Sequence, residues 1–114
     1  MGEYCCIRIW QLKQGASPTE LEALIGAEMT MMQNLLPGVK RCILFRIHPT
    51  TGEAAQYMLI IVFAHAEAYT YWRQVEEEAP TYWPNFASLL LRLEQSCTLL
   101  NEYIATIVLE KFIG

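Results

Sequence analysis

The sequence is short of charged residues, and it has no hydrophobic run long enough to cross a membrane. Charged residues make up 18% of the 114 positions and hydrophobic residues 54%, whereas typical soluble domains have about 25% and 45–50%. The longest apolar run, 57–64, is far shorter than the roughly 20 residues that a transmembrane helix needs. We therefore expect one domain, 1–114, which buries part of its apolar surface against a second subunit.

Positive charge is also scarce. Eight Lys and Arg residues stand against twelve Asp and Glu, which gives a net charge of −4 with no basic cluster. Proteins that bind nucleic acid or anionic membranes usually carry clustered Lys and Arg. We therefore expect no nucleic acid and no membrane among the partners.

Cysteine spacing gives no sign of disulfides. The four cysteines, Cys5, Cys6, Cys42 and Cys97, form no CxxC pair, and no cationic signal-like segment follows Met1. Adjacent residues on a strand point to opposite faces, so Cys5 and Cys6 are poorly placed to bond with each other. Buried free thiols in a reducing, cytoplasmic location are the expectation.

Short motifs of common enzyme classes are missing as well. The chain has no P-loop, dinucleotide fingerprint, GxSxG or Cys–His pattern, and no HxH or HExxH spacing. His48 and His65 could form a metal site only with a carboxylate such as Glu110. We therefore expect no metal and no cofactor, with an absorption spectrum as the direct test for haem or flavin.

What the sequence does contain is an alternation of strand and helix signals. Ser17, Pro18 and Glu20 form a helix start with a capping box, and Pro37-Gly38 ends that helix. We expect Pro80 to break the second helix and Pro84 to begin a further helical segment. The predicted strands are 4–13, 39–48, 57–64 and 101–112, and the predicted helices are 18–36, 66–78 and 84–97. This β-α-β-β-α-β order predicts an α+β, ferredoxin-like fold with an antiparallel sheet and helices on one face.

Side-chain alternation gives each predicted strand a mostly aliphatic face and a face with polar groups among large apolar ones. We expect the aliphatic faces, such as Cys5, Ile7 and Ile9, to pack on the helices. The other faces would share the open side of the sheet, which is too apolar to be left in water. A second copy packed sheet to sheet would cover that side and enclose a cavity. The open side would collect Arg8, Trp10, Arg46, His48, Tyr57, Phe63, His65, Thr106 and Glu110.

Three short segments of the sequence can be compared with known families. They are Leu36-Pro37-Gly38-Val39, Phe63-Ala64-His65-Ala66-Glu67-Ala68 and Thr81-Tyr82-Trp83-Pro84-Asn85-Phe86. In these segments the chain resembles the dimeric α+β barrel superfamily, and most closely its antibiotic-biosynthesis-monooxygenase-like (ABM-like) group. The sequence departs from the family pattern at Phe63, where Trp is usual, at His65, where Ser or Asp is usual, and at Tyr82-Trp83, where a His-Phe pair is usual.

The resemblance implies a homodimer that binds a small molecule. Relatives with quinol or anthrone substrates need no cofactor, haem-degrading relatives use a different set of residues, and other members have no known catalysis. If the chain is an enzyme, we expect cofactor-independent oxygenation of a small aromatic or polyketide-like substrate. The alternatives are a non-catalytic dimeric module that binds a ligand or only closes the dimer, and a regulatory ligand-binding domain.

Arg8 and His65 are the candidate catalytic residues. The Arg8 guanidinium could hold a substrate carboxylate or stabilise an oxyanion, and the His65 imidazole could accept a proton at the cavity rim. Each has an alternative: an ion pair between Arg8 and Glu110, and a solvent-exposed His65 at the start of a helix. Aromatic residues that could stack on a planar ligand, or else fill the core, are Trp10, Tyr57, Phe63, Trp72 and Trp83.

Overall fold

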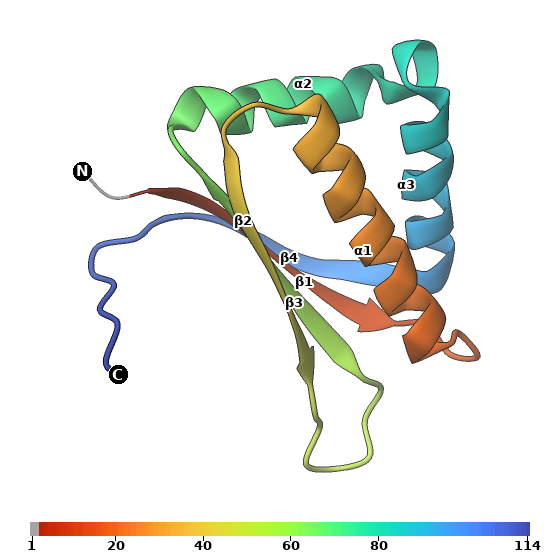
Figure 1. Cartoon of the computed structure of the whole chain (residues 1–114). Helices are drawn as coiled ribbons and strands as arrows, with labels where there is room; N and C mark the ends of the chain where they lie inside the picture. The colour runs from red at the N-terminus through yellow and green to blue at the C-terminus, as the bar shows by residue number, and fades with distance from the viewer. Residues whose placement is uncertain (1–2) are drawn as a thin grey trace.

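The computed structural model describes residues 3–114, which form one four-stranded sheet and three helices. The elements in chain order are β1 (Tyr4–Leu12), α1 (Pro18–Leu35), β2 (Val39–Ile47), β3 (Gln56–Phe63), α2 (Ala66–Tyr82), α3 (Pro84–Ser96) and β4 (Cys97–Thr106). The sheet order is β2-β3-β1-β4 and all neighbouring strands are antiparallel. The helices lie together on one side of the sheet (Figure 1). The predicted α+β ferredoxin-like fold is confirmed.

Local signals place α1 as predicted. The Ser17 hydroxyl accepts a hydrogen bond from the Glu20 backbone N–H at 3.2 Å, and Pro18 occupies the first turn. Beyond the helix, Gly38 has φ +93°, and a Cβ built on it would lie 2.8 Å from the Cβ of Ala68. Glycine is therefore needed here both for its backbone conformation and for the close approach of α2.

The predicted break at Pro80 is wrong. Helix α2 continues to Tyr82 with Pro80 inside it. Only one short turn follows the proline, and the Trp83 N–H closes it by donating to the Ala79 carbonyl at 2.9 Å. The loss of one backbone donor is tolerated here because the buried Ala79 anchors the turn against the core.

The last strand also differs from its predicted bounds. β4 begins at Cys97 and ends at Thr106, rather than covering 101–112. Thr106 pairs with Tyr4, the first residue of β1, so the residues that follow have no neighbouring strand to extend along. They leave the sheet on its open side (Figure 1).

The two faces of the sheet are the reverse of the prediction. Arg8 and Trp10 on β1 are buried beneath the helices, while Ile9 between them is only half-buried and belongs to the open side. On β3 the helix-facing residues are the fully buried Tyr57, Leu59, Ile61 and Phe63. The reversal has a physical reason: large aromatic rings fill the deep space under three helices, and the helices supply a carboxylate for the buried guanidinium.

The open side of the sheet is apolar. Ile43 and Phe45 on β2 are 36% and 47% exposed, and Tyr103 on β4 is 51% exposed. An ion pair between Arg41 and Glu110, 2.9 Å, ties segment 107–114 to β2. That segment adds four apolar side chains that are 83–95% exposed: Val108, Leu109, Phe112 and Ile113. Within residues 3–114, none of the helices has the length and hydropathy needed to cross a membrane.

Candidate functional site

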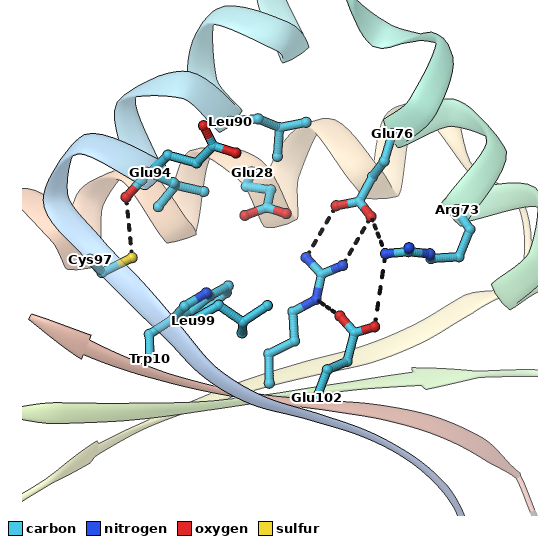
Figure 2. A pocket seen from close by; sticks show the side chains of 11 residues that line it. Trp10, Glu28, Arg73, Glu76, Leu90, Glu94, Cys97, Leu99 and Glu102 are labelled. Carbon is cyan, nitrogen blue, oxygen red and sulfur yellow. Dashed lines mark hydrogen bonds and ion pairs between the residues drawn. The ribbon is translucent and has the colours of Figure 1, made fainter.

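A pocket of about 370 Å³ lies between the sheet and the helices, a volume in the range of small-ligand sites. β1 and β4 form its floor, α2 and α3 form its walls, and α1 contributes one residue (Figure 2). The lining combines the apolar side chains Trp10, Leu90, Leu93, Cys97 and Leu99 with the charged side chains Arg8, Glu28, Arg73, Glu76, Glu94 and Glu102. Enclosed ionisable groups in a pocket of this kind mark it as the candidate site.

Arg8 forms the centre of an ion-pair network on the pocket floor. Its Nη1 and Nη2 donate to the two carboxylate oxygens of Glu76 at 3.1 and 2.9 Å, and its Nε donates to Glu102 at 2.6 Å. Arg73 reaches the same two carboxylates at 3.3 and 3.8 Å. The guanidinium also stacks over Trp72, 4.4 Å from the ring centroid. Two carboxylates therefore compensate the Arg8 charge before any ligand binds.

The electrostatics of Arg8 agree with that geometry. Burial acts to lower the pKa of its guanidinium, but the hydrogen bonds and charge of Glu76, together with Glu102, raise it above its ordinary value. Arg8 is thus a permanent cation held by fixed partners. A substrate carboxylate would have to displace one of them to receive the same bidentate contact.

Glu28 is the unusual group of the pocket. Its side chain is 1% exposed, yet neither carboxylate oxygen has a hydrogen-bond partner among the described residues. Burial raises the pKa of this carboxyl to about 7, with the positive charge of Arg8 acting in the opposite direction and the negative charge of Glu76 adding to the rise. Figure 2 shows the carboxyl directed into the cavity. At neutral pH it can both accept and donate a proton.

The structure brings two of the seven predicted site residues into this pocket, Arg8 and Trp10. Trp72 lies behind them against the Arg8 guanidinium. Tyr57 is buried in the same core but donates its hydroxyl hydrogen to Glu22 on α1 at 2.6 Å. The expected Arg8–Glu110 pair does not form, because Glu110 pairs with Arg41.

The remaining three predicted site residues lie outside the pocket. Phe63 packs in the core against Trp72 and Tyr69, with ring centroids 5.6 and 5.7 Å away. Trp83 lines a separate hollow of about 230 Å³ next to α1. His65 caps α2: its Nδ1 accepts the Ala68 N–H at 3.2 Å and its side chain is 60% exposed. His65 is therefore outside the pocket and committed to a helix terminus.

The sequence interpretation missed Glu28, although a signal was present. Glu28 stands on the buried stripe of α1, as the charged member of an otherwise apolar helix face with Leu21, Leu24, Ile25 and Met32. Glu76 was hidden in the run Glu76-Glu77-Glu78, which suggested a solvated helix end. Its position four residues after the buried Trp72 places it on the inner face of α2.

The pocket lining also includes one thiol, that of Cys97. Burial raises the pKa of the Cys97 thiol to about 11, so it carries no thiolate at neutral pH and is not an activated nucleophile. Among residues 3–114, no three His, Cys, Asp or Glu side chains are grouped so that they could hold a metal ion. Glu28, by contrast, is the lining carboxyl whose pKa burial raises to about 7.

Comparisons with known proteins give matches at the level of structure. No family model and no curated protein matches the sequence. The cofactor-independent oxygenase SnoaB from Streptomyces nogalater is similar with a TM-score of 0.71 and 17% identity, over 96% of this chain and 97% of that protein.

Two further solved structures are similar over nearly their whole length. A dimeric ferredoxin-like protein from an uncultured marine organism gives a TM-score of 0.64 at 12% identity, covering 97% of this chain and 100% of that one. A protein from Chloroflexus aurantiacus J-10-fl, assigned to the antibiotic biosynthesis monooxygenases, gives 0.56 at 16% identity, covering 98% and 99%. At these identities the likeness concerns the fold, and the chain has the ferredoxin-like fold of these structures.

Proposed function

We propose that the protein binds a small aromatic or polyketide-like molecule in the pocket under its helices and oxygenates it without a cofactor. The observation that carries this proposal is Glu28, a buried carboxyl with no partner among the described residues, a pKa near neutrality and a cavity in front of it. The similar fold of SnoaB, itself a cofactor-independent oxygenase, supports the same reaction class. Glu28 replaces His65 as the proposed base, because His65 is engaged as a helix cap.

The proposed chemistry needs molecular oxygen and one proton acceptor. Glu28 takes a proton from an activated CH₂ group of the substrate, which leaves a carbanion stabilised by the attached aromatic rings. The carbanion gives one electron to O₂, the two radicals combine, and the resulting peroxide takes the proton back. Loss of water then leaves a carbonyl, so that R₂CH₂ and O₂ become R₂C=O and H₂O.

The other residues have supporting roles in this scheme. Trp10 offers an aromatic face on which a planar substrate can stack. Arg8 holds the Glu76 and Glu102 side chains in place and so fixes the shape of the pocket floor. The apolar side chains of the lining limit contact between the substrate and water, which protects a carbanion from quenching.

The test is oxygen consumption with a panel of anthrones and electron-rich phenols. We expect uptake of O₂ with at least one of them, and a loss of about 10²–10⁴-fold in kcat for Glu28→Gln. His65→Ala, which removes the alternative of an imidazole base, should retain the rate. No uptake with any compound, or full activity of Glu28→Gln, would refute the proposal. A ligand-induced rise in melting temperature without uptake would favour the non-catalytic binding module.

We also propose that a second copy of the chain covers the open side of the sheet. Support comes from the exposed apolar side chains of Ile43, Phe45 and Tyr103, from the apolar segment 107–114 beside them, and from the similar fold of a dimeric ferredoxin-like protein. An uncovered surface of this kind is unfavourable in water. The four free cysteines, three of them buried, support a reducing, cytoplasmic location for that dimer.

Light scattering after size exclusion tests the dimer. The wild-type mass should be twice that of one chain, and Phe45→Asp should lower it, because a charge would be buried in the interface. Leu91→Asp is the matched control, since Leu91 is a 56% exposed apolar residue on α3, on the helix side of the sheet. A monomeric wild type at all concentrations would contradict the proposal.

A further inference from the structure

The charged groups that line the pocket do not balance. Arg8 and Arg73 pair with Glu76 and Glu102, two cations with two anions. Two lining carboxyls are left over, Glu28 at the inner end and Glu94. Neither carboxyl has a hydrogen bond or ion pair with another residue of segment 3–114; the nearby Lys13 ammonium donates to the backbone carbonyl of Glu94.

Glu94 lies where the pocket meets a second hollow. A cleft of about 630 Å³ between α2 and α3 shares Glu76, Leu90 and Glu94 with the pocket and continues past Pro80 and Pro84. The Glu94 side chain is exposed, in contrast to that of Glu28. A ligand that enters through this cleft therefore meets one unpaired carboxylate at the mouth and a second carboxyl at the end.

This arrangement discriminates against anions. A ligand carboxylate at the inner end of the pocket would find both lining cations, Arg8 and Arg73, already paired with Glu76 and Glu102. The ionised form of Glu28 would also repel it, and repulsion between like charges is strong away from water. A ligand N–H or O–H, by contrast, would give the orphaned Glu28 oxygens the hydrogen bond that burial denies them. A buried acceptor without a partner is costly, so supplying that partner favours binding.

We infer that the pocket takes a planar aromatic ligand that donates a hydrogen bond to Glu28 from a phenolic O–H or an amine and carries no negative charge. This inference rests on the pocket of the proposed function and specifies its substrate class. It also replaces the expectation that Arg8 binds a substrate acid, because Arg8 is already held by Glu76 and Glu102.

Three probes that share one ring system test the inference: 2-naphthol, 2-naphthylmethylamine and 2-naphthoate. Calorimetric titration of the wild-type protein at pH 7 should show the neutral phenol and the ammonium binding about tenfold or more tightly than the carboxylate, a difference of about 1.4 kcal/mol. Equal or tighter binding of 2-naphthoate would overturn the inference, and so would binding by none of the three.

Two variants distinguish the contributions of the Glu28 and Glu94 carboxyls to ligand binding. Glu28→Gln should weaken binding of 2-naphthol and the amine, whereas Glu94→Gln should narrow the difference in affinity between the ammonium and 2-naphthoate. Glu77→Gln, which changes an exposed carboxylate on α2 outside the pocket lining, is the matched control and should leave the order unchanged. If Glu28→Gln and Glu94→Gln both leave the order and the affinities as they are, the inference fails.

The outcome of this binding experiment can be told apart from the outcome of the oxygen-consumption experiment. If anionic substrates are bound and consume O₂ through Glu28, the substrate class is wrong and the reaction stands. If the predicted order of affinities holds but no substrate consumes O₂, the reaction is wrong and the inference about the ligand stands.

Discussion

Above neutral pH, the Glu28→Gln variant should be more stable than the wild type. Its free energy of unfolding should also depend less on pH. Burial raises the pKa of Glu28 from its ordinary value of 4.5 to about 7. The folded protein therefore binds an extra proton between these two values, and the unfolded chain does not. The stability that comes from this group is fully present below about pH 4.5 and is lost as the pH rises through about 7.

The magnitude follows from the two pKa values. A difference of about 2.5 corresponds to about 3 kcal/mol, at about 1.4 kcal/mol for each unit. The amide of the Glu28→Gln variant cannot ionise, so its free energy of unfolding, minus that of the wild type, should increase by about 3 kcal/mol from about pH 4 to about pH 8. Arg8 and Glu76, the charged groups that act on Glu28, are present in both proteins and largely cancel in this difference.

Urea denaturation followed by circular dichroism is a suitable assay, with both proteins at equal concentration at each pH. The exposed control Glu77→Gln should show a difference from wild type that is flat with pH. A flat difference for Glu28→Gln as well, within about 0.5 kcal/mol, would show that Glu28 is not a buried carboxyl with a raised pKa. The proposed base would then lose its physical support.

Three further substitutions test the packing around the site. Arg8→Ala should destabilise the fold by about 1.5–3 kcal/mol in urea denaturation, because the partly buried Glu76 carboxylate loses its two charged hydrogen bonds from Arg8. Arg41→Ala at an exposed pair should cost about 1 kcal/mol or less; equal effects would contradict the role of the Arg8 network. His65→Ala should lower stability by about 1 kcal/mol through loss of the α2 cap, and His65→Asn should restore it; no recovery would argue against the capping role. Gly38→Ala should lower the melting temperature more than Gly52→Ala, because both glycines have positive φ but only at Gly38 would the added Cβ meet a neighbour, Ala68 on α2. A larger effect at Gly52 would refute the close approach of α2 to Gly38.

Much of the fold follows from local signals. Ser17, Pro18 and Gly38 fix the ends of α1, and side-chain periodicity is enough to identify four strands and their order along the chain. The errors are at Pro80, where tertiary packing outweighs a helix breaker, and in β4, whose end is set by the length of β1 rather than by its own residues.

The candidate site is less visible in the sequence. Alternation divides the residues of a strand into two sets but does not say which set faces the helices, and here that assignment was reversed. The sequence predicts His65 as a base because histidine is a common proton acceptor, but in the structure His65 caps a helix. Glu28 was the informative residue, since a carboxylate on an apolar helix stripe needs either a partner or a function.

The sequence by itself determined that this chain is an α+β domain with a ferredoxin-like order of elements, because caps, breakers and periodicity act over a few residues. Only the tertiary structure decided that Arg8 is neutralised by Glu76 and Glu102 and that Glu28 has no partner among the described residues. Along the chain, Arg8 is 68 residues from Glu76 and 94 from Glu102, and only the packing of the helices and β4 around β1 brings these groups together. Electrostatic environment depends on burial and on neighbours in space, and both exist only once the helices have closed over the sheet.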